Sequence, residues 1–312
     1  MSKESSFMAA GTIPTKLLHN QIIDGKRIIP VHLQLIPTND CNLHCDFCSC
    51  SDADRTKQLT LDQMMQVIDV SSERGTKAIT ITGGGEPLMH PGLNEVIWYA
   101  NKRGIQVGLT TNGVLLNRLK KHENLTWCRI SSSDDRTPNY QAIRKAISVN
   151  PETDWAFAHV VTKEPDYQMI REIVDFTNEN QLSHVKLHPD LFNLPQIPMD
   201  MVRAYLEDKD TSRVIWQDRD NITRGTKNCY ISLLKPMVAP EGIFGCCGAQ
   251  YAIKGQERVM TDRMKMGDVE DLAKILDAQM PFNGAICDVC YYTRYNDALN
   301  KLKDKPRHKE FL

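Results

Sequence analysis

Between residues 31 and 190 the sequence alternates short, apolar, β-rich runs with amphipathic stretches, and this repetition constrains the fold more than any other feature. In the first amphipathic stretch the residues Leu61, Met64, Met65 and Ile68 fall on one helical face. Strands that alternate with helices in this way form a parallel sheet, either open or curled toward a barrel. We therefore predict an α/β fold with six strands, at residues 31–38, 77–85, 105–113, 126–133, 155–163 and 184–190.

Two short stretches add to this outline. The stretch "LLHNQIIDGKRII" predicts a hairpin around Asp24 and Gly25, before the first strand. The stretch "TNDCNLHCDFCSC", residues 38–50, follows the first strand directly. Because reactive groups in parallel α/β folds lie in loops at the carboxyl ends of strands, this second stretch is a candidate site.

The charge balance excludes a strong electrostatic attraction to polyanions. The chain has 312 residues, with 38 basic and 39 acidic side chains, and a formal net charge of -1. We therefore expect no strong nucleic-acid signal. No apolar run approaches the roughly 18 residues of a membrane span, and the first residues contain no apolar signal region. We expect a soluble, cytoplasmic protein without a membrane partner.

The ten cysteines are concentrated in two groups. Without a secretion signal we expect reduced thiols, which are available to metals. This distribution predicts two metal sites, with Cys128 between them. The groups are Cys41, Cys45, Cys48 and Cys50 near the start, and Cys229, Cys246, Cys247, Cys287 and Cys290 near the end.

Three cysteines in the first group suit an iron–sulfur cluster. Cys41, Cys45 and Cys48 follow the pattern C-x3-C-x2-C, and three thiolates occupy three corners of a cube of iron and sulfide. The fourth iron then stays open for chemistry. The alternative is a zinc site whose fourth ligand is Cys50 or His44.

This pattern, with Phe47 before its last cysteine, resembles the radical S-adenosylmethionine (SAM) enzymes. The second strand adds "TGGGEP", residues 82–87, which is similar to the glycine-glycine-glutamate motif of that family. The resemblance covers about residues 30–190 and implies a partial (β/α)6, TIM-like barrel. The simpler interpretation of the glycines alone is a strand-to-helix turn.

The resemblance also implies cofactors and residue roles. Cys41, Cys45 and Cys48 would hold a [4Fe-4S] cluster whose open iron chelates SAM. An electron from the reduced cluster would cleave SAM to methionine and a 5'-deoxyadenosyl radical, which takes a hydrogen atom from the substrate. An electron donor such as flavodoxin or ferredoxin is implied. The expected SAM-binding residues are Phe47, Gly84, Gly85, Glu86 and Ser131.

Later strands match the family less fully. Ser133 stands where many family members have an aspartate, and Asp134 follows it. The stretch "TTNG", residues 110–113, is also similar to the family, although a plain type I' turn explains it equally well. Lys163 and His188 end the fifth and sixth predicted strands, where each either contacts substrate or is solvated.

The second cysteine group resembles the twitch domain, a shortened SPASM extension that begins C-x(9-15)-G-x4-C. With four residues between Gly242 and the cysteine, the motif places that cysteine at Cys247, which we prefer to its neighbour Cys246. The resemblance implies one auxiliary [4Fe-4S] cluster, and a four-cysteine zinc site is the alternative. The expected ligands are Cys229, Cys247, Cys287 and Cys290.

These features predict four segments. Residues 1–29 form an N-terminal extension, 30–190 the barrel core, 191–228 a linker covering the barrel, and 229–312 a small α+β twitch-like domain. We expect a radical SAM oxidoreductase or isomerase-type enzyme, whose catalytic residues the sequence does not identify. A small molecule, sugar or nucleotide is the preferred substrate. The alternatives are a radical SAM enzyme that modifies peptides by dehydrogenation, epimerisation or crosslinking, and a non-catalytic zinc-binding module.

Overall fold

Ten strands form one sheet in the computed structural model, which describes residues 16, 27–121, 125–194, 196–218, 223–251 and 262–303. The strand order is β10-β9-β8-β1-β2-β3-β4-β5-β6-β7. The hairpin predicted around Asp24 and Gly25 lies outside the described residues.

The first seven strands along the chain are all parallel and neighbour one another in chain order. All six predicted strands are confirmed, and a short seventh follows them. The bounds are β1 (His32–Leu35), β2 (Ala78–Ile81), β3 (Gln106–Thr111), β4 (Leu125–Ser133), β5 (Asp154–Val161), β6 (His184–Pro189) and β7 (Val214–Trp216).

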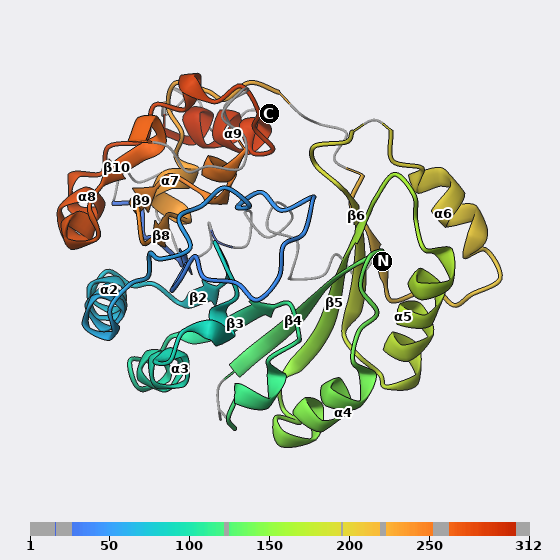
Figure 1. Cartoon of the computed structure of the whole chain (residues 1–312). Coiled ribbons are helices and arrows are strands. Elements are labelled where there is room, and N and C mark those ends of the chain that lie inside the picture. Colours follow the sequence, from blue (N-terminus) through green and yellow to red (C-terminus); the bar gives the residue numbers. More distant parts are fainter. Residues whose placement is uncertain are drawn as a thin grey trace.

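The helices between these strands cover the outer face of the curved sheet, as Figure 1 shows for α2 to α6. They are α2 (Leu61–Glu73), α3 (Leu93–Lys102), α4 (Tyr140–Val149), α5 (Tyr167–Glu179) and α6 (Met199–Tyr205). Because strand side chains alternate between faces, every second residue packs against these helices. The core beneath α2 and α3 contains Leu33, Leu35, Ile79, Ile81, Met64, Ile68, Val96 and Ile97.

Local signals explain where these helices begin. Thr60 and Gln63 form a reciprocal capping box at the start of α2. The side chains of Asn139 and Asp166 accept hydrogen bonds from the first turns of α4 and α5. Among the described residues between β3 and β4, only the 3-10 turn η3 (Leu116–Arg118) forms.

The C-terminal part extends the same sheet. It contains α7 (Ile231–Leu234), β8 (Met237–Ala239), β9 (Gly242–Phe244), β10 (Lys265–Gly267), α8 (Leu272–Ala278) and α9 (Thr293–Lys303). Strand β8 pairs parallel with β1, whereas β9 and β10 are antiparallel. Short 3-10 turns complete the described chain: η2 (Pro87–Met89), η4 (Cys247–Gln250), η5 (Asp262–Met264), η6 (Val269–Asp271) and η7 (Gly284–Ile286).

The structure is a mostly parallel α/β fold of the partial-barrel type, and its sheet is not closed. Within the described residues, the edge strands β7 and β10 do not pair with each other. No helix in this part of the chain is both long and apolar enough to cross a membrane. The division into four segments stays a prediction.

The β8–β9 turn depends on a glycine. Gly242 has a φ of +133°, and a Cβ there would lie 2.5 Å from the carbonyl oxygen of Gly267. We expect Gly242→Ala to lower the free energy of unfolding by about 3 kcal/mol, because strain and overlap add. The measurement is chemical unfolding followed by circular dichroism.

Gly104→Ala is the matched control. Gly104 also has a positive φ, +73°, but no atom lies within 4 Å of the added Cβ. Gly104→Ala should therefore lower the free energy of unfolding by only about 1–2 kcal/mol, which is the strain of the left-handed conformation. Equal costs at the two positions would contradict the overlap argument.

Candidate functional site

The loops after β1 and β2 are joined by backbone hydrogen bonds. Gly85 N donates to Thr38 O at 2.9 Å, and Glu86 N donates to Asp40 O at 2.8 Å. A Cβ on Gly85 would lie 1.9 Å from Asp40 O, and one on Gly84 would lie 2.3 Å from an Asn39 side-chain oxygen. The glycines therefore let the cysteine loop lie directly against the loop after β2.

The Glu86 carboxylate connects this pair of loops to the loop after β3. One carboxylate oxygen accepts from Leu88 N at 3.0 Å and from the Thr111 hydroxyl at 2.7 Å, and the other accepts from Asn112 N at 2.7 Å. Burial, with only 2% of the residue exposed, raises the pKa of Glu86, and these hydrogen bonds oppose the shift. In this structure Glu86 positions the three loops.

Two residues that the sequence analysis did not select extend this network. The Asn112 side-chain amide donates to Asn42 Oδ1 at 2.8 Å and lies 4.0 Å from Cys41 Sγ. Arg136 donates to the carbonyl oxygens of Asn112 at 3.1 Å and Ser131 at 2.6 Å. The stretch "TTNG" was a signal for Asn112, whereas no motif pointed to Arg136.

The three predicted cluster ligands are close together on one half-buried loop. Burial raises the pKa of Cys45 to about 11, Arg136 opposes this shift, and the nearby Cys48 and Cys41 add to it. Cys48 N donates to Cys45 O at 3.0 Å, which closes the loop. Three neighbouring thiols fit three corners of an iron–sulfur cluster, and the charge of iron would stabilise their thiolates.

The other residues expected at this site have different surroundings. Phe47 and Ser131 are half-buried, whereas His44, the alternative zinc ligand, is exposed. Cys50 and Cys128 are buried. Within the described residues, no three His, Cys, Asp or Glu side chains are arranged to hold a single metal ion. In a cluster each cysteine binds a different iron, so their sulfur atoms do not meet at one ion.

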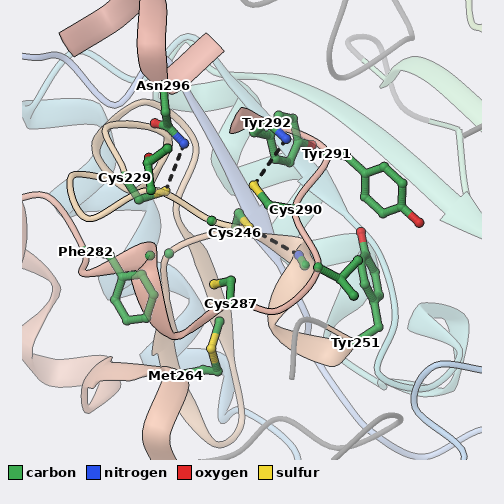
Figure 2. Close-up of a pocket in the computed structure, with 16 residues that line it drawn as sticks. Cys229, Cys246, Tyr251, Met264, Phe282, Cys287, Cys290, Tyr291, Tyr292 and Asn296 are labelled. Atoms are coloured by element: carbon green, nitrogen blue, oxygen red, sulfur yellow. Dashed lines mark hydrogen bonds between the residues drawn. The ribbon is translucent and has the colours of Figure 1, made fainter. Parts of the chain in front are cut away.

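The second cysteine group lines a pocket in the C-terminal part. Figure 2 shows the sulfur atoms of Cys229, Cys246, Cys287 and Cys290 facing one another there. Cys247 is not among the lining residues, and its sulfur lies 3.9 Å from the Tyr292 hydroxyl. Cys246 is fully extended, with φ -169° and ψ 174°, so consecutive side chains point to opposite sides. This geometry favours Cys246 over the expected Cys247 as the fourth ligand.

Three of these sulfur atoms accept hydrogen bonds from N–H groups. Cys229 accepts from the buried Asn296 side chain at 3.5 Å, Cys246 from Gly248 N at 3.3 Å, and Cys290 from Tyr292 N at 3.3 Å. Such bonds orient metal-ligating sulfur and stabilise its negative charge. The four-cysteine donor set therefore fits a metal or an iron–sulfur cluster.

Burial raises the pKa of the thiols in this pocket. The pKa of Cys229 is raised to about 11 and that of Cys287 to about 12, and the pKa of Cys246 is raised well above its usual value. A metal that binds there would have to displace these protons, which couples its affinity to pH.

Backbone pairing holds the pocket together. Gly225 N donates to Cys287 O at 2.9 Å, and Cys290 N donates to Thr223 O at 2.7 Å. Cys229 N donates to Phe282 O at 2.9 Å. These bonds place the C-x2-C stretch beside the segment that precedes α7.

Side chains also connect the C-terminal part to the first cysteine loop. Ser49 Oγ donates to Gln250 Oε1 at 3.0 Å, and the buried Asn39 donates to Glu241 in the β8–β9 turn. In Figure 1 the blue loop after β1 runs beside the orange C-terminal segment. The two cysteine groups therefore belong to neighbouring parts of one surface.

Residues 35–180 match the model of the Radical SAM superfamily, so the chain contains a radical SAM domain. This finding supports SAM and one [4Fe-4S] cluster as its cofactors.

Two relatives named GTP 3',8-cyclase match parts of the chain. The one from Staphylococcus saprophyticus subsp. saprophyticus is 34% identical over 146 residues, which is 40% of this chain and 42% of that protein. The one from Staphylococcus aureus strain JH9 is 41% identical over 100 residues, which is 29% of this chain and 28% of that protein. The chain therefore spans less than half the length of these relatives.

Solved structures share the fold. Streptococcus suis SuiB bound to S-adenosylmethionine superposes with a TM-score of 0.58 at 16% identity, covering 80% of this chain and 65% of that one. The anSMEcpe structure with bound AdoMet gives a TM-score of 0.55 at 14% identity, covering 79% of this chain and 80% of that one. At these identities the likeness concerns the fold alone.

Removing the Glu86 carboxylate tests its positioning role. Glu86→Ala leaves the amides of Leu88 and Asn112 without their acceptor, so the free energy of unfolding should fall by about 1–3 kcal/mol. SAM binding should weaken roughly tenfold while the iron content stays unchanged. Thermal unfolding, calorimetry and iron analysis provide the measurements.

Glu164→Ala, at an exposed glutamate, is the control and should change none of these quantities. Unchanged SAM affinity in Glu86→Ala would show that the three loops do not need the carboxylate to form the binding site.

Proposed function

We propose that this protein is a radical SAM enzyme with two [4Fe-4S] clusters. Cys41, Cys45 and Cys48 hold the first. The observation that supports this most directly is the contact between the cysteine loop and the loop containing Gly84, Gly85 and Glu86. A non-catalytic zinc module would not require the two loops to be joined in this way.

When bound, the first cluster supplies the electron that cleaves SAM to methionine and a 5'-deoxyadenosyl radical. The chain's own residues shape the binding site. Gly84 and Gly85 keep the loop after β2 close to the cysteines, and Glu86 with Arg136 fixes the neighbouring loops. Phe47 and Ser131 remain the proposed contacts of SAM.

The auxiliary cluster is proposed for the pocket in Figure 2, in a twitch-like C-terminal domain. We assign Cys229, Cys246, Cys287 and Cys290 as its ligands, in place of the set with Cys247 expected from spacing. Four cysteines saturate a [4Fe-4S] cluster, so we propose that it serves substrate conversion through electron transfer or positioning.

The proposed substrate is a small molecule, with nucleotides the preferred class. The relatives named GTP 3',8-cyclase support this choice, although they match only part of the chain. A peptide-modifying activity is the second candidate, because SuiB, of the same fold, has been solved bound to precursor peptide SuiA.

The remaining partners follow from the chemistry. A small electron-transfer protein such as flavodoxin or ferredoxin is the proposed reductant. All ten cysteines are free in the structure, which supports a reducing compartment, and we propose the cytoplasm.

Replacing Cys41, Cys45 and Cys48 together with alanine tests the proposed function. After anaerobic reconstitution, this variant should produce no 5'-deoxyadenosine from SAM and dithionite, because the electron-donating cluster is lost. It should retain about half of the wild-type iron, because the second site keeps its ligands. Chromatography of the nucleoside product and iron analysis measure these results.

Cys128→Ala is the matched cysteine control, since Cys128 is buried on the helix-covered face. It should form 5'-deoxyadenosine at the wild-type rate. Absence of SAM cleavage in the wild-type protein, or zinc in place of iron, would refute the proposed function.

The adjacent cysteines provide a second test. Cys246→Ala should lose the iron and the absorption of the auxiliary cluster, whereas Cys247→Ala should retain both. Both variants should cleave SAM, because the first cluster is intact. If instead Cys247→Ala loses this iron and Cys246→Ala retains it, Cys247 is the fourth ligand, as the spacing predicts.

A further inference from the structure

A group of basic side chains lies on the concave face of the sheet, opposite the helices. The register aligns Arg129 of β4 with Ala156 of β5 and His184 of β6. One step nearer the carboxyl ends of the strands, Ala158 of β5 aligns with Lys186 of β6. At these two levels β5 presents only alanines, so no large side chain of β5 stands between the basic residues.

The pKa of His184 shows that these groups share one environment. Burial, together with the positive charges of Arg129 and Lys186, lowers this pKa to about 3. His184 is therefore neutral at physiological pH, and the positive charge on this face belongs to Arg129 and Lys186.

Arg129 is a half-buried cation with few partners among the described residues. Its Nε is buried and has no hydrogen-bond partner among the described residues. One Nη donates to the Thr110 hydroxyl at 3.4 Å, and the guanidinium lies 5.4 Å from the centre of the Trp127 ring. Burial lowers the pKa of Arg129 to about 10, and the neighbouring sulfur atoms of Cys128 and Cys247 oppose the shift.

Among the described strand residues of this face, no carboxylate lies beside Arg129. From the level of Arg129 to the carboxyl ends of β3 to β6, the residues that the register places here include no Asp or Glu in the described chain. A partly desolvated cation without an anionic partner is unfavourable, and a guanidinium suits an oxyanion because it donates in a planar fork.

The basic group lies beside both proposed cofactor sites. Ser131, two residues after Arg129 on β4, accepts the hydrogen bond from Arg136, which also binds the loop containing Asn112. On the other side, Cys247 of the C-terminal part is close enough to influence Arg129. A ligand here would lie between the first cysteine loop and the auxiliary pocket.

We propose that Arg129 and Lys186 form a subsite for an oxyanion of the substrate, either a phosphate or a carboxylate group. The subsite is an anion site of the protein in its own right, and its assignment to the substrate rests on the proposed function. Arg129 provides the planar donor fork, and Lys186 provides the second charge across the alanines of β5.

Calorimetric titration of the reconstituted protein tests this proposal. The probes are inorganic phosphate and acetate. Each is added in the presence of saturating SAM, so that the SAM site is already occupied and the probe cannot bind there in place of the SAM carboxylate. The variants are Arg129→Gln and Lys186→Met. Lys102→Met, at an exposed lysine on α3, is the matched control.

We expect the wild-type protein and Lys102→Met to bind at least one probe equally well, and the two subsite variants to bind it about tenfold more weakly. The tighter probe identifies the chemical class of the group. If Arg129→Gln does not fold, by circular dichroism and iron content, Lys186→Met decides alone.

Wild-type affinity in Lys186→Met, no binding of either probe by the wild-type protein, or loss of probe binding on adding SAM would each overturn the proposal. These outcomes are independent of SAM cleavage. A protein that forms 5'-deoxyadenosine but binds no anion refutes the subsite alone, and one that binds the anion but never cleaves SAM refutes the proposed function alone.

Discussion

The candidate site depends on the buried carboxylate of Glu86. It joins the loops after β2 and β3, while the adjoining glycines hold the cysteine loop after β1 by backbone hydrogen bonds. These contacts are short-range and directional, so they set the relative positions of three loops that lie far apart in sequence. The arrangement of the thiols relative to the rest of the barrel follows from this one buried group.

The second organising constraint is the pairing of β8 with β1. This pairing attaches the C-terminal part to the strand that leads into the first cysteine loop. The contacts of Asn39 with Glu241 and of Ser49 with Gln250 then hold the two parts together. Because the C-terminal part continues the sheet, it lies beside the strand that leads into the first cysteine loop, which suits the electron transfer or substrate positioning proposed for it.

Periodicity predicted much of the fold, because strand and helix patterns are local properties of the chain. All six strands were found at their expected positions. The alternation is interrupted after β3, where the described residues form only the 3-10 turn η3. The cysteine motif and "TGGGEP" were evident from spacing alone, whereas Arg136, Arg129 and Asn296 were not, because their partners are remote in sequence.

The sequence by itself determined the alternation of strands and helices, the loop that carries Cys41, Cys45 and Cys48, and the grouping of the remaining thiols near the C-terminal end. Only the tertiary structure decided that Cys246 faces the other three cysteines and that Cys247 does not. Spacing counts residues, but the direction of a side chain depends on the local backbone, and Cys246 is fully extended. That Arg129 Nε has no hydrogen-bond partner among the described residues also became evident only in the folded sheet, because folding decides which groups lie beside it.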